Sequence, residues 1–387
     1  MKDPADRPPH TAFIMRILYF TRDYTPHDHR FLASLAESEH QVFFLPLERR
    51  GHRQEARPLP PGITPVSWAG GEKPARLWDV PRLLRSLRRV IDQIKPDVLH
   101  AGPVQTAALL AALSGFRPLV TMSWGSDMLV DAERRGYYRW ATSYVLKRSA
   151  VFLGDCNAVR QKGLSFGYPD EQIITFPWGV DLDHFSPGIE DGGLRRQSGW
   201  AGGTFVVMHV RSWAPVYGVD VFAKAFVIAA QRLPELRLLM PGDGPLEGKI
   251  RQIFIQGGVI DRIKFSGQVK QADLPDYYRA ADLYVSASHS DGSSVSLMEA
   301  LACGLPALVS DIPGNREWIE HGVQGWQFPD GDAEALAAGI LQAAAAKENL
   351  VKMGQAARQL AEARADWRRN FKKLLDAYQL AQRDGIR

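Results

Sequence analysis

The sequence predicts an α/β protein made of two doubly wound, Rossmann-like domains. Short apolar runs that end in turns alternate with helical patterns, which is typical of strands and helices around a parallel sheet. This alternation stops in a stretch rich in Pro, Gly and Asp, at residues 177–188, and then starts again. The length of 387 residues agrees with more than one domain, because domains average about 150 residues.

The first series of elements follows residues 1–14, which carry three prolines and no periodic pattern. Because they also precede a second methionine, Met15, we interpret them as a disordered leader or an upstream start; they lack the apolar core of a signal peptide. A buried strand is then predicted at 15–20, a turn at 22–26 and a helix at 29–38. Further strands are predicted at 41–45, 97–100, 119–122, 151–153 and 173–175.

The second series opens with a strand at 204–210 and a helix at 219–232. Later strands are predicted at 237–240, 263–265, 283–286 and 307–310, followed by an Ala-rich helix at 333–347 and two more helices. Trp367, Phe371 and Tyr378 are the aromatic anchors of the last one. We therefore expect a first domain at 15–187 and a second at 188–365, with the ligand site between them.

The composition excludes several classes of protein. With 45% apolar and 23% charged residues the chain is neither disordered nor collagen-like, and its best apolar stretch, 107–112, is too short to cross a bilayer. Two cysteines provide neither a disulfide framework nor a thiolate zinc site, which favours the cytoplasm. Residues 1–180 carry 24 basic and 18 acidic side chains, but no nucleic-acid-binding motif, so we expect no nucleic-acid partner.

The most informative segment is 286–327, where a predicted strand is followed by Gly292, Ser293 and Ser294 and then by a helix. Such a turn presents backbone N–H groups and hydroxyls at the positive end of a helix dipole, which suits a phosphate. The alternative for the turn taken alone is an ordinary Ser N-cap.

Two acidic residues, Asp291 and Glu299, flank this turn. Eight residues of helix would separate them by about 12 Å, whereas retaining glycosidases hold their carboxylates about 5–5.5 Å apart. We interpret them as grips on separate parts of an extended ligand. A solvated Asp and a helix-face Glu are the alternative, although Glu299 lies among apolar residues and needs a partner.

The arrangement resembles the family-4 retaining glycosyltransferases of the GT-B fold, whose signature is Glu-x7-Glu followed by Ala-x-Ala/Ala-x-Gly-x-Pro. This chain has Asp291-x7-Glu299 and then ALACGLP at 300–306. Three further segments are similar to family motifs, namely WGVDLDHF at 178–185, PGDGP at 241–245 and DIPGNRE at 311–317. The resemblance runs from Met15 onward and implies two domains that face a central cleft, with a final helix, 366–387, that crosses back to the first domain.

The resemblance also implies roles for matching residues. Glu299 would hold the ribose of a nucleotide, and Asp291 would hold hydroxyls of the donor sugar. The N–H groups of Ser293, Ser294 and Val295, in the turn that starts at Gly292, would cradle the diphosphate. Arg211, after the strand 204–210, would neutralise the diphosphate as it leaves; a surface arginine is the alternative. Gly242 lies in the segment PGDGP at 241–245, which is similar to the family motif at the end of a strand, and the resemblance implies that it contacts the donor.

Several features depart from the family pattern: Asp291 stands where the signature has Glu, and the loop 23–30 stands where the first domain usually has a Gly-Gly loop. Tyr217 stands where a Lys is common, so one cationic side chain that would bind a phosphate is missing. Lys249 or a main-chain dipole is the candidate replacement for its charge. Trp124 stands where many members have a His, and it can stack on a sugar but not transfer a proton. His27 and Asp127 are candidate acceptor-side residues, with a polar helix start as the alternative for His27.

A metal site is not favoured by the sequence. Asp-x-Asp occurs at Asp181-Leu182-Asp183 and Asp330-Gly331-Asp332, but both lie in turn-rich contexts where Asp is common. We expect no cofactor and no divalent metal, the nucleotide sugar being a substrate.

Two basic segments suggest contact with an anionic membrane or a lipid diphosphate. The predicted helix 82–95 has leucines and isoleucines on one face and arginines on the other, and aromatic residues alternate with arginines at 134–140. The alternative is a helix that covers the sheet and exposes solvated arginines.

Together these features predict a metal-independent retaining hexosyltransferase that uses a nucleoside diphosphate sugar, UDP being favoured over GDP. The acceptor would be a hydroxyl of a lipid-linked or saccharide substrate in envelope glycolipid or polysaccharide synthesis. The expected location is the cytoplasm, with peripheral association at the inner face of the plasma membrane. The alternatives are a GT-B phosphorylase, a sugar-nucleotide epimerase, or a degenerate scaffold that only binds a nucleotide sugar.

Overall fold

The computed structural model describes residues 14–48, 55, 57–134, 136–188, 193–200 and 202–384. Residues 1–13 of the predicted leader lie outside the described residues. Contacts within the chain form two compact units. Of the described residues, the first unit comprises those within 14–153, 163–174 and 374–384, and the second comprises those within 154–162 and 175–373. Residues 175–187, which were predicted to belong to the first domain, thus group with the second unit. The assignment of the acceptor to the first domain and of the donor to the second stays a prediction.

The first sheet has seven strands in the order β3-β2-β1-β4-β5-β6-β7. Its strands are β1 (Arg16–Thr21), β2 (Gln41–Pro46), β3 (Ile63–Pro65), β4 (Val98–Gly102), β5 (Leu119–Met122), β6 (Val151–Gly154) and β7 (Ile173–Thr175). The connecting helices are α1 (Pro26–Ala36), α2 (Val80–Ile94), α3 (Ala107–Ser114), α4 (Ser126–Leu129), α5 (Tyr137–Leu146) and α6 (Asn157–Ser165). β1 pairs in parallel with both β2 and β4.

The second sheet has six strands in the order β10-β9-β8-β11-β12-β13. They are β8 (Phe205–Met208), β9 (Leu236–Pro241), β10 (Ile263–Gly267), β11 (Leu283–Ser286), β12 (Ala307–Ser310) and β13 (Gly325–Phe328). Its helices are α7 (Gly193–Gln197), α8 (Val219–Arg232), α9 (Glu247–Gln256), α10 (Leu274–Arg279), α11 (Val295–Ala302), α12 (Pro313–Arg316), α13 (Ala333–Ala345) and α14 (Lys347–Arg364). The last helix, α15 (Trp367–Asp384), begins in the second unit and belongs to the first from residue 374 onward. The predicted fold class, α/β with two doubly wound sheets, is confirmed.

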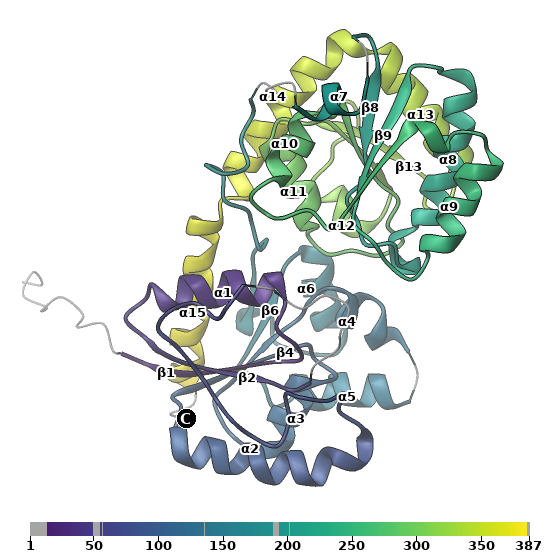
Figure 1. The fold of residues 1–387 in the computed structure, drawn as a ribbon. Coiled ribbons are helices and arrows are strands. Elements are labelled where there is room, and N and C mark those ends of the chain that lie inside the picture. Colours follow the sequence, from purple (N-terminus) through teal and green to yellow (C-terminus); the bar gives the residue numbers. More distant parts are fainter. Residues whose placement is uncertain are drawn as a thin grey trace, which may run out of the picture. The chain divides into compact units, whose positions relative to one another are not determined.

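Alternation along β8 explains why this strand is apolar throughout. Phe205 and Val207 pack into one buried cluster with Phe222 of α8 and Phe254 of α9. The residues between them, Val206 and Met208, belong to a second cluster with side chains of α10 and α11. In Figure 1, α8 and α9 lie on one side of β8 and β9, and α10 and α11 lie on the other. Both faces of the sheet are therefore covered, as parallel sheets require.

Several element ends differ from the sequence prediction. α1 begins at Pro26 rather than at residue 29, because Thr25 and Asp28 form a reciprocal capping box at its start. The edge strands β3 and β13 were not predicted, since neither is a continuous apolar run: β3 reads ITP with one buried residue, and β13 reads GWQF.

No helix among the described ranges combines the length and the apolar character needed to cross a membrane.

Candidate functional site

A buried arginine organises the ends of two strands in the second unit. Arg211 follows β8, and the side chain is 11% exposed. Its guanidinium donates to Asp291 Oδ2 at 2.5 Å, to Ser294 Oγ at 2.8 Å and to Ser296 Oγ at 3.1 Å. Its carbon Cζ lies 4.2 Å from the ring centroid of Tyr217. A carboxylate, two hydroxyls and an aromatic face thus hold this cation in one orientation.

Electrostatics keep this guanidinium charged. Burial on its own would lower the pKa of Arg211, but the negative charge of Asp291 outweighs this effect and raises the pKa above its usual value. The cation is therefore permanent at physiological pH.

The turn between β11 and α11 meets this arginine. Ser294 is the N-cap of α11, because its side chain accepts a hydrogen bond from the Leu297 amide. The ordinary N-cap considered in the sequence analysis is therefore present, and the same hydroxyl also accepts from Arg211. Val295 is the first residue of the helix, and such first-turn amides have no partner within their helix. The turn can thus offer N–H groups beside a fixed cation, which suits an anion.

The Ser293 amide makes a contact that the sequence did not predict. It donates to Asp155 Oδ2 at 2.8 Å, and the Ser293 hydroxyl donates to the Asp155 carbonyl at 2.7 Å. Trp318 Nε1 donates to the same hydroxyl at 3.2 Å. In this structure, the amide expected to bind a diphosphate is therefore paired with a carboxylate.

Glu299 lies on α11 and is 5% exposed. Its Oε2 accepts a hydrogen bond from the Tyr278 hydroxyl at 2.8 Å, and its Oε1 accepts one from Gln271 Nε2 at 3.1 Å. The partner that a buried acid requires is thus provided by two neutral groups, neither of which the sequence analysis identified. The signal available was the apolar surrounding of Glu299, which predicts that a partner exists but not which residue it is.

Gly242 and Tyr217 lie close to Arg211 as well. Gly242 follows β9 with φ = 108°, and a Cβ atom there would lie 3.4 Å from the Arg211 carbonyl oxygen. Tyr217 ends a short 3-10 helix, and Gly218 then begins α8 from a left-handed conformation. Lys249, considered as a substitute for the missing cation, instead pairs with Asp220 at 2.8 Å.

Two of the three candidate acceptor-side residues come together in the first unit. The rings of His27 and Trp124 have centroids 5.7 Å apart. Asp127 is 4% exposed, and it accepts hydrogen bonds from the Ser123 hydroxyl and from the amides of Val104, Trp124 and Met128. These bonds give Asp127 a structural role in its loop, and its acceptor-side role stays a prediction.

The Asp-x-Asp segments have local partners. Asp181 accepts from the amides of Asp183 and His184, Asp330 pairs with His289, and Asp332 caps α13. Within the described residues, no three His, Cys, Asp or Glu side chains gather as metal ligands would.

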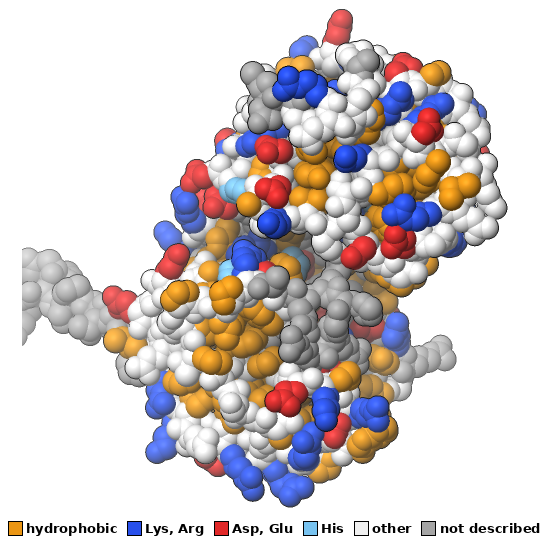
Figure 2. All heavy atoms as spheres, in the orientation of Figure 1, with side chains coloured by type: hydrophobic (Ala, Val, Ile, Leu, Met, Phe, Trp, Pro, Cys, Tyr) orange, Lys and Arg blue, Asp and Glu red, His pale blue; other side chains and the backbone are white. Residues whose placement is uncertain are grey.

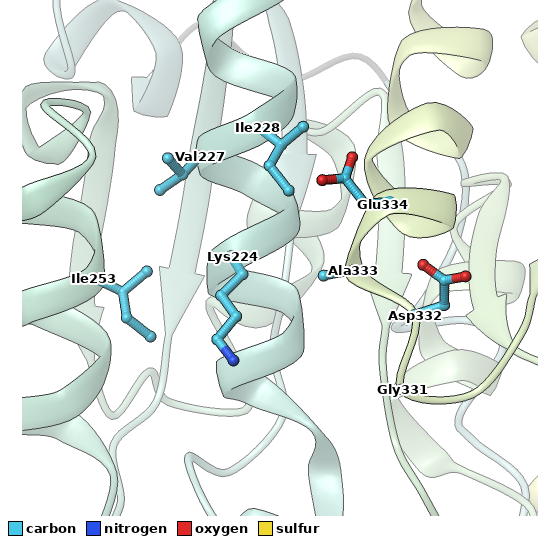
Figure 3. A pocket seen from close by; sticks show the side chains of 8 residues that line it. All are labelled: Lys224, Val227, Ile228, Ile253, Gly331, Asp332, Ala333 and Glu334. Atoms are coloured by element: carbon cyan, nitrogen blue, oxygen red, sulfur yellow. The ribbon is translucent and has the colours of Figure 1, made fainter.

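The cavity in Figure 3, of about 630 Å³, lies elsewhere in the second unit. Val227, Lys224 and Ile228 of α8, Ile253 of α9 and residues 331–334 line it. None of the predicted site residues is among them, so the strand-end cluster around Arg211 remains the candidate site.

Comparison with known proteins identifies two family models in this chain. The model for "Glycosyltransferase Family 4" matches residues 27–184, and that for "Glycosyl transferases group 1" matches residues 192–360. Together they cover most of the chain.

The similarity to individual proteins is low in sequence identity. The chain is 27% identical to the amylovoran biosynthesis glycosyltransferase AmsK of Erwinia amylovora over 62% of its length, and it spans 58% of that protein. It is 25% identical to the UDP-Gal:alpha-D-GlcNAc-diphosphoundecaprenol alpha-1,3-galactosyltransferase of Escherichia coli, over 65% of this chain and 67% of that one. Among solved structures, Anabaena HepE in complex with UDP-glucose matches with a TM-score of 0.78 at 20% identity, over 94% of this chain and 99% of that one.

Gly218 should tolerate no side chain. A Cβ atom there would lie 1.9 Å from the Ala287 carbonyl oxygen, and the residue has φ = 56°. We expect Gly218→Ala to lower the free energy of unfolding by about 2–4 kcal/mol in urea denaturation, from overpacking and strain together. The matched control is Gly258→Ala, because Gly258 has φ = 66° with open space around it. Equal losses in the two variants would contradict this explanation.

Proposed function

We propose a function on one premise: the chain belongs to glycosyltransferase family 4 and has the GT-B fold. It transfers a hexosyl group from a nucleoside diphosphate sugar to an acceptor hydroxyl, with retention of the anomeric configuration. The observation that carries the proposal is the permanent cation of Arg211 at the turn before α11, where a leaving diphosphate would gain charge.

The proposed mechanism uses the leaving group itself as the base. The bond between C1 of the sugar and the phosphate oxygen breaks, the acceptor oxygen bonds to C1 on the same face, and its proton passes to the departing phosphate oxygen. Arg211 stabilises this oxygen more in the transition state than in the substrate, because the charge grows as the bond breaks. No protein nucleophile is required, and the reaction proceeds without a divalent metal.

Three further residues would position the donor. Glu299 would accept hydrogen bonds from the ribose hydroxyls in exchange for those from Tyr278 and Gln271. Asp291 would hold hydroxyls of the sugar while remaining close to Arg211. Tyr217 would compensate in part for the absent Lys, because its ring keeps the guanidinium in position even though it adds no charge.

The donor we favour is a UDP-hexose, and the acceptor is a saccharide or lipid-linked saccharide. Support comes from the UDP-glucose that Anabaena HepE binds and from the diphosphoundecaprenol-linked sugar in the name of the Escherichia coli relative. A role in envelope polysaccharide or glycolipid synthesis follows from these acceptors, in agreement with the amylovoran relative.

A melting-temperature panel tests the choice of nucleotide. UDP, GDP, ADP and their sugars are compared at equal concentrations, and UDP and UDP-glucose are expected to raise the melting temperature most. A ligand that binds only the folded chain at 100 times its Kd stabilises it by about 2.7 kcal/mol. A shift with GDP-mannose but not with UDP-glucose would overturn the choice of base, and no shift with any of them would contradict nucleotide binding.

Removing the cation should slow transfer strongly, and circular dichroism checks that the variant is folded, because Asp291 loses its partner. We expect Arg211→Gln to lower kcat by about 10²–10³ in an assay of sugar transfer or donor hydrolysis, as loss of a charge-stabilising donor does elsewhere. Glu299→Gln should mainly raise KM for the donor. The control is Arg232→Gln, an exposed arginine at the end of α8.

The same assay separates the alternatives. Activity that persists in EDTA and a product with the α-configuration of the donor support the proposal. Release of a sugar 1-phosphate indicates a phosphorylase, and an epimerised donor without an acceptor indicates an epimerase. Wild-type turnover equal to that of both variants would mean a non-catalytic scaffold.

We further propose that α2 and the residues before it contact an anionic membrane. Residues 72–95 carry seven basic and three acidic side chains. Leu77 and Trp78 are 74% and 72% exposed, which is unusual for apolar side chains of this size. Figure 2 shows basic side chains gathered where Figure 1 draws α2. Tyr137 and Trp140 of α5 form a second exposed aromatic group, whereas Arg135 lies outside the described residues.

Vesicle co-sedimentation tests this surface. Binding to phosphatidylglycerol vesicles should exceed binding to phosphatidylcholine vesicles, and it should weaken with salt. Replacing Arg82, Arg85 and Arg89 by Gln should lower the affinity at least about tenfold, because each cation near such a surface contributes about 1 kcal/mol. Leu77→Ser with Trp78→Ser should also weaken binding. The control is Val351→Ser with Lys352→Gln, an exposed pair on α14; an equal loss there would contradict the assignment.

A further inference from the structure

We propose that Asp155 is a built-in occupant of the anion-binding turn, and that the donor diphosphate binds by displacing its carboxylate from the Ser293 amide. This inference rests on the proposed function, because it assumes that a diphosphate binds at the turn. It adds a residue that controls donor affinity and that no sequence motif identified.

The geometry places the carboxylate on the turn itself. Asp155 Oδ2 accepts the hydrogen bond of the Ser293 amide at 2.8 Å. A Cβ atom on Gly292 would lie 2.1 Å from the same oxygen, so only glycine leaves room for the carboxylate there. Asp155 thus takes from the turn the contacts that an anionic ligand would take.

The carboxylate is buried and incompletely paired. Asp155 is 4% exposed, and its Oδ1 has no hydrogen-bond partner in the described part of the chain. A buried carboxylate without full pairing is costly, in contrast to Asp291, which has the Arg211 guanidinium as its partner. The carboxylate is therefore poorly stabilised at this position, and an anion that is better paired there can replace it.

The backbone beside Asp155 is anchored to the same unit. Residues 154–162 group with the second unit by their contacts. Glu317 accepts hydrogen bonds from the amides of Asn157 and Ala158, both at 3.0 Å. Because these bonds hold the start of α6, we infer that displacement moves the Asp155 side chain and leaves this backbone in place.

The charges around Asp155 oppose its ionised form. Burial raises its pKa to about 7, and the negative charge of Asp291 adds to this effect. The other titratable group that acts on it is the neighbouring Cys156 thiol, and burial raises the pKa of that thiol as well. Because the group gains its proton as the pH falls through 7, the repulsion of a diphosphate weakens in that direction. Donor affinity should therefore rise from pH 8 to pH 6.

Binding of UDP-glucose tests the proposal, because both of its phosphates keep a fixed charge over this pH range. Titration calorimetry compares wild type with Asp155→Asn at pH 6, 7 and 8. For wild type we expect Kd to fall at least fivefold from pH 8 to pH 6, roughly as the carboxylate protonates. At pH 8, Asp155→Asn should bind about tenfold more tightly than wild type, with little pH dependence, since it carries no charge.

The matched control is Asp261→Asn, the same change at an exposed aspartate between α9 and β10, which should behave as wild type. Weaker or unchanged binding by Asp155→Asn would overturn the proposal. Asp155 would then either stabilise the bound donor or have no effect on its affinity. If that variant does not fold, the pH dependence of wild type decides: a Kd equal at pH 6 and pH 8 contradicts the proposal.

Two measurements separate this proposal from the choice of donor. In the ligand-free protein, the Ser293 amide resonance should titrate near pH 7 in wild type and not in Asp155→Asn; an amide that does not titrate in wild type contradicts the contact. Inorganic pyrophosphate, compared at pH 8, should bind Asp155→Asn more tightly than wild type whatever the base of the donor. Equal binding to both proteins, or binding to neither, would overturn the displacement even where UDP-glucose fails to bind.

Discussion

The second unit depends on the placement of one buried cation. Arg211 is enclosed after β8, and a guanidinium at that depth destabilises the fold unless an opposite charge and hydrogen-bond acceptors lie beside it. Asp291 neutralises it and the hydroxyls of Ser294 and Ser296 accept from its Nη1, which leaves Nε as the one nitrogen of the group without a hydrogen-bond partner among the described residues. These partners lie in the turn before α11 and in its first residues, so the same contacts that stabilise Arg211 also fix the turn. Stability and the candidate anion site thus share one set of bonds.

The order of the strands explains why these residues meet. Along the second sheet, β8 lies between β9 and β11, so the chain winds outward in one direction from β8 through β9 and in the other from β11 onward. At such a switch point the connections leave in opposite directions, and a crevice forms beyond the carboxyl ends of the two strands. Arg211 follows β8 and Asp291 follows β11, so both reach this crevice. The first sheet has the same kind of switch point between β1 and β4.

The parts that the sequence could predict are those that depend on local patterns. Fully buried strands such as β8 are continuous apolar runs. The turn at Gly292 can be identified because a glycine and two serines stand together directly before a helical pattern. The partners of the site could not be predicted in this way. Tyr278 reaches Glu299 across 21 residues, and Asp155 reaches Ser293 across 138. A single sequence carries no record of such contacts, because many arrangements of the same helices would satisfy the periodicity equally well.

Tyr217 stands where the family resemblance predicts a lysine. The two side chains would affect the binding of a diphosphate in different ways. A second cation would add Coulomb attraction for a diphosphate, and it would also repel Arg211 at close range. Tyr217 adds no charge, but its ring faces the guanidinium at 4.2 Å and favours one orientation of it. Since Asp291 already neutralises Arg211, this ion pair carries no net charge before a ligand binds. Attraction of a distant anion is then weak, and binding depends on the short-range contacts that the turn and the oriented guanidinium offer. A site of this kind selects its ligand by the geometry of the diphosphate rather than by its charge alone.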